Sequence, residues 1–412
     1  MHSEKIFINV NKGVKLQDQD LVKGLLVTKI PLESQQQHYR FTENEINSIR
    51  ANVGRQWDQL AHWTAKPDIK GFFKQSQAET SDLSWLINLT YPDLETSEED
   101  QPLFSHFNNL MRKQEESASQ IFTNIRKTML LLNDWISDPE IKNLLGLLIH
   151  QYNNVKVDKL WKDLRSIRTK SELVERLKKE CFTMLPVDKD QDDRYQLQEL
   201  NYEDKGHREK LFNLFLLLDV AKLFPINGRK AAAYDFVKIS SEQWSIEHIF
   251  PQNADDFKEV DYLEEDDLKV IREMLPALDL SLLKEDFREA GSALYNKILT
   301  QERVYLEKED KKVLEHLLKS HSSSLHSFGN LALLSKPVNS SLSNHFFNVK
   351  RGRIVQKVSK GEFVPFHTYD VFSKLIINTN TGLHTWAEAD IKAHEHYVNK
   401  QAKQIADYLT SK

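Results

Sequence analysis

Several features that would assign a sequence to a common protein class are scarce or missing here. One cysteine, Cys181, occurs among 412 residues, so a disulfide framework is excluded and we expect a small buried side chain in a reducing compartment. Glycine and proline number only 12 and 11, while leucine, lysine, glutamate and glutamine are plentiful, which predicts a mainly helical protein. No apolar run is long enough to span a bilayer, and no signal-peptide pattern opens the chain. We therefore expect a cytoplasmic protein without a membrane partner.

A positive net charge is also missing. The formal charge of −5 excludes a general attraction to nucleic acid, so any contact with DNA must come from a local basic patch. The one clear basic cluster in the sequence comprises Lys350, Arg351, Arg353, Lys357 and Lys360. Residues 254–325 instead open with a run of acids, and we expect them to form a helical insertion whose negative face lies away from nucleic acid.

Residues 41–229 show apolar side chains at helical spacing. Thr42 and Glu45 fit a capping box at the start of this region. A stripe on one helical face consists of Trp57, Leu60 and Trp63. Stripes of this kind are more often core than ligand sites, so we assign this one to packing. The pattern then becomes strand-like at Tyr234–Ile239 and again from Trp244 onward.

Two separated segments carry the residues with chemical potential. The first is a short strand that ends in a turn at Pro251, with Glu247 and His248 at its tip. The second places Asn330 after a glycine, continues as an apolar strand, and leads into a polar helix that begins at Asn339. Strand, strand and helix with His, Asn and Asn at these places is the layout of a ββα-metal (HNH) nuclease site.

These residue types suit hydrolysis of a phosphodiester. His248 is the candidate general base because the pKa of imidazole lies near neutrality, provided that its Nε2 is held toward the attacking water. Asn330 can tie down the loop that holds His248. Glu247 and Asn339 offer oxygen ligands to one divalent ion, Mg²⁺ or Mn²⁺. Lys350 lies on nearly the same helical face as Asn339, and with Arg351 and Arg353 it can contact the phosphate backbone of DNA.

Alternatives remain at several of these positions. Glu247 points to the strand face opposite His248 unless the turn bends it round. His345 competes with Asn339 for the metal, because the two cannot share one helical face. His321 and His326, in a serine-rich loop, carry little weight. Each residue also has an ordinary explanation as a surface pair, a turn or a cap, and it is their ordered occurrence that favours a site.

The motifs resemble a known family. Glu-His-Ile-Phe-Pro-Gln-Asn from Glu247, Gly-Asn-Leu-Ala-Leu-Leu around Asn330, and the later Asn339 and Lys350-Arg351 are similar to the C-terminal HNH nuclease domain of GmrSD-type, modification-dependent (type IV) restriction endonucleases. The resemblance implies His248 as base, Asn330 as orienting residue, and Glu247 with Asn339 as metal ligands. It also implies DNA as substrate and a role in bacterial defence against phage or modified foreign DNA.

The resemblance extends along most of the chain. It implies a remnant of the family's N-terminal domain at 1–35, a helical domain at 36–230, the nuclease domain at 231–375 and a C-terminal helix at 376–412. The family's N-terminal domain has a ParB-like fold, and its Asp-Gly-Gln-Gln-Arg nucleotide motif is absent here. We therefore expect no NTP hydrolysis by this chain and a separate ParB-like NTPase as a possible partner. Two other functions stay open: a non-catalytic DNA-binding or partner-docking subunit, and an RNA-cleaving toxin.

Overall fold

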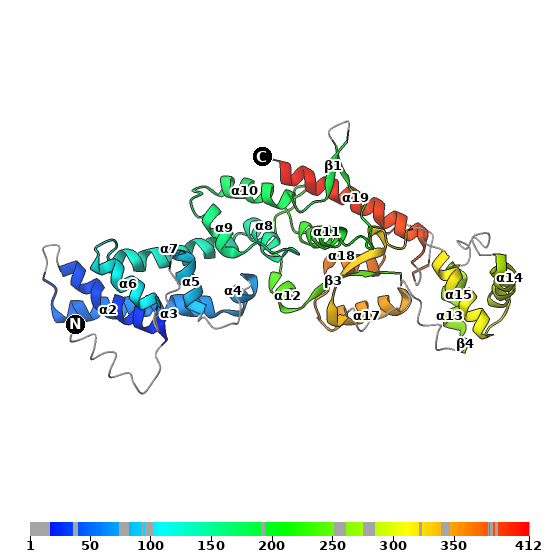
Figure 1. Ribbon diagram of the computed structural model, residues 1–412, viewed down its shortest axis with the longest axis horizontal. Coiled ribbons are helices and arrows are strands. Elements are labelled where there is room, and N and C mark those ends of the chain that lie inside the picture. Colours follow the sequence, from blue (N-terminus) through cyan, green and yellow to red (C-terminus); the bar gives the residue numbers. More distant parts are fainter. Residues whose placement is uncertain are drawn as a thin grey trace. The chain divides into compact units, whose positions relative to one another are not determined.

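The computed structural model describes residues 17–35, 40–73, 82–92, 94, 102–190, 194–250, 261–274, 285–320, 324–338, 347–377, 379, 382–383 and 386–411. Within them the chain is mainly helical, as the composition predicts (Figure 1). The chain forms two compact units, the first from 1–142 with 155–168 and the second from 143–154 with 169–412. The division falls inside the region 36–230 that we expected as one helical domain.

The first unit is built from helices alone among its described residues. Its helices are α2 (Asp18–Gln35), α3 (Glu43–Ala65), α4 (Pro67–Phe72), α5 (Asp82–Thr90), α6 (Pro102–Arg112), α7 (Ala118–Ser137) and α9 (Val157–Leu164). The expected capping box starts α3: Thr42 accepts from the Glu45 N–H, and the Glu45 carboxylate accepts from the Thr42 N–H. The Trp57 stripe of the same helix is buried, which confirms its assignment to packing. Helix α8 (Pro139–His150) contains the boundary between the units.

The second unit combines helices with short strands. Its helices are α10 (Lys170–Phe182), α11 (His207–Ala221), α12 (Phe236–Ser241), α13 (Glu265–Met274), α14 (Glu285–Thr300), α15 (Lys308–Ser320), the 3₁₀ turn η4 (Phe328–Asn330), α17 (Phe347–Ser359), α18 (Phe366–Phe372) and α19 (Glu388–Thr410). Its strands are β1 (Val187–Lys189), β2 (Tyr195–Leu197), β3 (Trp244–His248), β4 (Tyr262–Leu263), β5 (Val304–Tyr305) and β6 (Leu331–Ser335). Helix α11 is buried from Leu211 to Ala221, and α19, red in Figure 1, packs against α10, α11 and η4.

The strand expected at Tyr234–Ile239 is a helix instead. Asp235 caps α12 by accepting from the Val237 N–H, and the side chains of Phe236 and Ile239 are buried one helical turn apart. The ring of Phe236 lies directly over Gly146 of α8, where a side chain would collide with it. An apolar pair three residues apart suits a helix, whereas the β-branched Val237 and Ile239 also suit a strand. The short segment therefore fitted both, and the prediction of a strand was wrong.

Strands β3 and β6 form an antiparallel ladder that joins the two candidate segments. Trp244 pairs with Ser335 at one end, and His248 pairs with Leu331 at the other. Every residue of β6 is buried, which fits its unbroken apolar sequence. The described part of 254–325, between the two strands, is helical as expected, apart from a short β4–β5 ladder that the sequence analysis did not predict.

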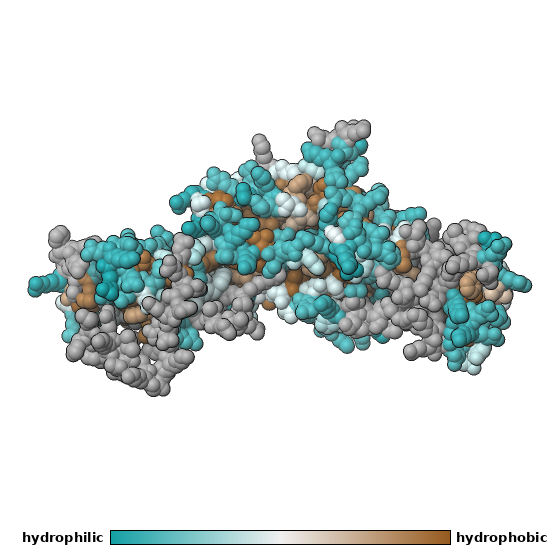
Figure 2. Space-filling model, in the orientation of Figure 1, coloured by the Kyte–Doolittle hydropathy of each residue, from teal (hydrophilic) through white to brown (hydrophobic). Residues whose placement is uncertain are grey.

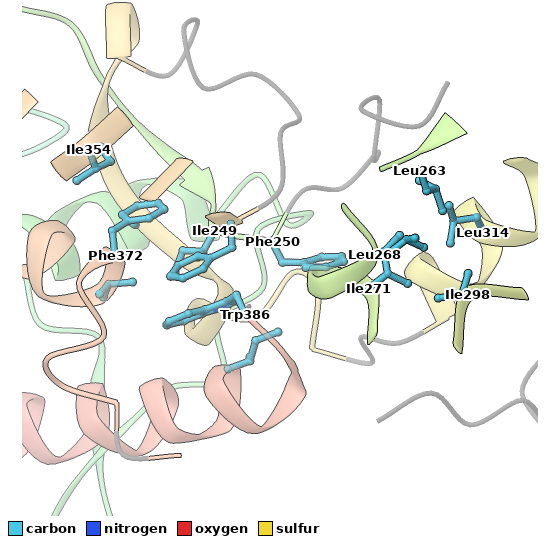
Figure 3. Packing of buried hydrophobic residues seen from close by; sticks show 14 of the residues in the cluster. Ile249, Phe250, Leu263, Leu268, Ile271, Ile298, Leu314, Ile354, Phe372 and Trp386 are labelled. Carbon is cyan, nitrogen blue, oxygen red and sulfur yellow. The ribbon is translucent and has the colours of Figure 1, made fainter. Parts of the chain in front are cut away.

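A continuous apolar core connects these strands with the insertion. Ile249, Phe372 and Trp386 lie in one part of this core, and Leu263, Leu268, Ile271, Ile298 and Leu314 fill the interior of the insertion (Figure 3). Phe250 lies beside Leu268 and Ile271, so the residue two positions after His248 links both groups (Figure 3). The path of the chain after the predicted base is therefore determined by burial on both of its sides.

Hydrophilic side chains cover most of the face that Figure 2 shows, and apolar ones emerge between them in small patches. Such scattered exposure is ordinary for a folded domain. None of the helices in the described ranges combines the length and the hydropathy needed to cross a membrane.

A buried histidine pair joins the second candidate segment to the C-terminal helix. His394 Nδ1 donates to the Gly329 carbonyl at 2.8 Å, so its Nε2 accepts from His367 Nε2 at 3.0 Å. This arrangement requires a neutral His394, because its Nε2 must keep a lone pair to accept from His367. Burial lowers the pKa of His367 well below 6.5 and that of His394 to about 4.

We expect acid to destabilise the second unit through these groups. A histidine whose pKa is lowered by folding takes up its proton preferentially in the unfolded chain. The free energy of unfolding therefore falls as pH drops from 6.5 toward the folded pKa, by on the order of 2–3 kcal/mol for His394 alone. Burial raises the pKa of Asp219 to about 6, which opposes part of this loss. Urea unfolding at pH 7.5 and 4.5 should show the lower free energy of unfolding at pH 4.5, and equal values would contradict the neutral pair.

Candidate active site

His248 ends strand β3 in a buried position. Its side chain is 7% exposed, and the ring packs edge-on against Tyr202, with ring centres 4.7 Å apart. Burial, together with the nearby His326 and Lys350, lowers the pKa of His248 to about 3. The imidazole is therefore neutral at pH 7 and carries a lone pair that can accept a proton.

Sequence reasoning gave His326 little weight and missed Glu203. His326 Nδ1 lies 3.3 Å from His248 Nε2, and His326 Nε2 lies 3.3 Å from a carboxylate oxygen of Glu203. A backbone bond from the Tyr202 N–H to the His326 carbonyl, 2.9 Å long, joins the two loops that carry these residues. Only their proximity in the folded chain identifies them as site residues, because Glu203 lies 45 positions before His248 in the sequence and His326 lies in a serine-rich loop.

When both rings are neutral, the order of these contacts determines which nitrogen of each ring carries the proton. Glu203 accepts the Nε2 proton of His326, so a neutral His326 presents the lone pair of Nδ1 to His248. His248 then donates from Nε2 and keeps Nδ1 as its basic nitrogen. This differs from the sequence expectation, in which Nε2 faces the attacking water: here Nε2 is engaged by His326.

Asn330 holds the chain that follows His248. Its side chain is fully buried; Oδ1 accepts from the Phe250 N–H at 2.8 Å, while Nδ2 donates to the carbonyls of Phe250 and Leu325. The Asn330 backbone carbonyl also accepts from the Ile249 N–H. These bonds tie the loop after the predicted base to the loop that carries His326, which is the position expected from the sequence.

Lys350 has surroundings different from the expected phosphate-facing ones. Its side chain is 4% exposed, and Nζ donates to the backbone carbonyl of His248 at 2.7 Å. A buried ammonium engaged in this way serves to hold the end of β3, because a charged group inside the protein is stable only while it keeps such a partner. On the same helix Arg351 and Arg353 are half-buried, and Nε of Arg351 has no hydrogen-bond partner among the described residues.

Of the two expected metal ligands, the structure describes Glu247. Glu247 is half-buried and accepts from Ser245 Oγ at 3.0 Å, which places both side chains on one strand face, opposite His248, as predicted. The pKa of the Tyr202 phenol is raised mainly by burial and, in second place, by the negative charge of Glu247. Asn339 and its competitor His345 lie outside the described residues, as do Pro251 and His321. Over the parts of the chain that the structure describes, no cluster of three His, Cys, Asp or Glu side chains could hold a metal.

Comparison with known families decides the assignment. A family model described as GmrSD restriction endonucleases, C-terminal domain, matches residues 187–400, more than half of the chain. The chain belongs to this family. The matched region contains Glu203, Glu247, His248, His326 and Asn330, and the family is one of restriction endonucleases, which places the chain among nuclease hydrolases. No curated protein and no solved structure matches the chain.

Proposed function

We propose that this GmrSD-family chain is a metal-dependent HNH endonuclease that hydrolyses DNA phosphodiester bonds in bacterial defence against phage or modified foreign DNA. One observation carries the proposal: a buried, neutral His248 ends a strand whose ladder partner begins at Asn330, inside the region that the family model matches. Strands β3 and β6 followed by α17 supply the order of elements of a ββα-metal module.

In this proposal His248 is the general base. A pKa of about 3 keeps the ring unprotonated at pH 7 but makes it a weak base. The negative charge of a bound phosphodiester raises the pKa of a neighbouring imidazole, which brings His248 closer to the range that suits proton transfer. Lys350 and Asn330 position the base, because Lys350 holds the carbonyl group of His248 and Asn330 holds the backbone of Phe250, two residues later.

His326 and Glu203 extend the base into a relay. When Nδ1 of His248 accepts a proton from water, its Nε2 proton can pass to Nδ1 of His326. The positive charge then rests on His326, whose other nitrogen faces the Glu203 carboxylate. Each transfer moves one proton, and the two together leave His248 neutral with its proton on Nδ1.

We expect His326→Gln to lower the cleavage rate roughly tenfold or more, within the range of acid–base contributions. Because His326 helps to lower the pKa of His248, the acid limb of the pH–rate profile should also move to higher pH. The exposed His396 of α19 gives a matched control, His396→Gln, which should behave as wild type. A variant at His326 with the wild-type pH profile would contradict the relay.

Glu247 and Asn339 are the proposed ligands of one Mg²⁺ or Mn²⁺. Mg²⁺ commonly takes one or two carboxylates and keeps several waters, and the half-buried carboxylate of Glu247, which lies on the strand face opposite the His248 ring, can supply one such ligand. A bound divalent ion supplies positive charge that stabilises the phosphorane-like transition state and the leaving oxygen.

Arg351 and Arg353 are the proposed contacts to the DNA backbone, whereas Lys350 is an internal anchor. Arg351→Gln/Arg353→Gln should reduce the slope of log K against log salt by up to about 2, since each phosphate contact contributes close to one. Lys350→Met should leave that slope unchanged and lower the cleavage rate, because it frees the end of β3. Binding isotherms at several salt concentrations measure the slopes of both variants, and plasmid cleavage measures the rate. A flatter slope for Lys350→Met would place Lys350 at the DNA interface.

The function is tested with purified protein on supercoiled plasmid, with Mg²⁺ or Mn²⁺ and with EDTA as the control. Unmodified plasmid, modified phage DNA and RNA are compared in parallel. Nicking or cutting of DNA that needs the metal supports the proposal. Cleavage of RNA alone would support the toxin, and binding of DNA without cleavage of any substrate, with and without an added ParB-like NTPase, would support a non-catalytic subunit.

A further inference from the structure

A cavity of about 530 Å³ lies within the helical unit formed by 1–142 and 155–168. It is bordered by the end of α5, by α6, by one face of α7 and by α9 with the turn that follows it. All of its lining residues precede residue 187, so the cavity lies outside the region that the family model matches. A volume of this size is typical of a small-molecule site.

The cavity has an excess of positive charge. Lys127, Arg165 and Arg168 line it with exposed side chains, and none of them forms an ion pair with another described residue. Glu116 is the one carboxylate among the described lining residues, and it accepts from the Tyr91 hydroxyl at 2.7 Å. Burial and this bond raise the pKa of Tyr91, so the phenol stays a neutral donor to Glu116. The arrangement suits an anion.

A buried donor without a partner also borders the cavity. The side chain of Trp161 is 5% exposed, and its indole N–H has no hydrogen-bond partner among the described residues. Buried polar groups are rarely left unsatisfied, and a ligand acceptor is one way to satisfy this one. Packing against Trp135, with ring centres 5.6 Å apart, holds the indole in place.

Aromatic, hydroxyl and apolar side chains make up other parts of the wall. Tyr91 packs edge-on against His106, and the hydroxyls of Thr90 and Thr128 bond to each other at 3.0 Å. Leu131 adds an apolar side. A cavity lined by both aromatic side chains and arginines offers the groups on which nucleobases stack and to which phosphates bind.

We propose that this cavity binds a nucleoside monophosphate unit, either as a free nucleotide or as one residue of a DNA strand. Arg165, Arg168 and Lys127 bind the phosphate, the aromatic walls hold the base, and the Trp161 N–H donates to an acceptor of the ligand. The site is independent of the nuclease proposal, because none of its residues belongs to the unit that contains His248.

Calorimetric titration of the full chain carrying His248→Ala, in EDTA, tests the site without cleavage. The probes are deoxyadenosine monophosphate, inorganic phosphate and a short single-stranded oligodeoxynucleotide. We expect Arg165→Gln/Arg168→Gln to weaken binding of the nucleotide about tenfold or more, as loss of a charge-assisted contact does. Arg50→Gln/Arg55→Gln on α3 removes the same charge from exposed positions outside the cavity and should leave the affinity unchanged. Trp161→Phe keeps the packing, removes the N–H and should weaken binding several-fold.

The probes separate the two sources of the ligand. Binding of deoxyadenosine monophosphate, tighter than that of phosphate, indicates a free nucleotide; binding of the oligonucleotide alone indicates a strand. The proposal is overturned if neither binds, if phosphate binds as tightly as the nucleotide, or if the two double variants lose affinity equally.

Discussion

Replacing His248 by alanine is expected to reduce DNA cleavage by at least about 100-fold, the lower end of what a positioned general base contributes. The fold should persist, because Lys350 bonds to the backbone carbonyl at position 248 rather than to the ring, and Asn330 bonds to the backbone of Phe250. Both anchors survive the substitution. Plasmid nicking measures the rate, and urea unfolding checks the stability of the variant.

A matched variant makes this result specific. His396 is an exposed histidine of α19, so His396→Ala removes the same side chain away from the proposed site and should leave the rate unchanged. Cleavage by His248→Ala at the rate of His396→Ala would remove His248 from the role of base. If the wild type cuts only with an added partner protein, both variants are compared in its presence.

Replacing Gly329 by alanine is expected to cost the second unit on the order of 3 kcal/mol of unfolding free energy, at the upper end of overpacking effects. A Cβ at this position would lie 2.5 Å from the backbone carbonyl oxygen of Ile391 and would also collide with the side chain of Glu395. Helix α19 must move away from η4, and the bond between His394 Nδ1 and the Gly329 carbonyl is lost with that movement. Because Asn330 is the next residue, the site should loosen as well.

Gly352 of α17 provides the control for this variant. Apart from the backbone of α17 itself, no atom of the described residues lies within 4 Å of a Cβ added there, so Gly352→Ala should raise stability by up to about 1 kcal/mol through helix propensity. Urea unfolding of both variants beside wild type gives the two differences directly. A Gly329→Ala protein as stable as wild type would show that α19 does not pack on η4 as described.

Local patterns determined much of the helical structure. The capping box at Thr42, the apolar face of α3 and the break between α7 and α8 depend on residues within a few positions of one another, so periodicity and cap chemistry suffice to predict them. Phe236 and Ile239 show the limit of such reasoning, because a short apolar segment fits a strand or a helix until its neighbours are known.

The candidate site divides in the same way. The order of Glu247, His248 and Asn330, with the apolar strand after Asn330, was sufficient by itself to suggest the family and the elements that carry the site. Residue type and spacing along one or two strands determine these features, and they are visible in the sequence.

Only the tertiary structure decided what surrounds the base. It placed His326 beside His248 and Glu203 beside His326, so that Nε2 of His248 contacts His326 instead of facing the attacking water. It also showed that Lys350, expected at the surface, is a buried anchor of the His248 carbonyl. It also assembled the cationic cavity from α5, α6, α7 and α9. These contacts join residues far apart in the chain, and burial determines the charge state of each group; neither distance in space nor burial can be read from the order of residues.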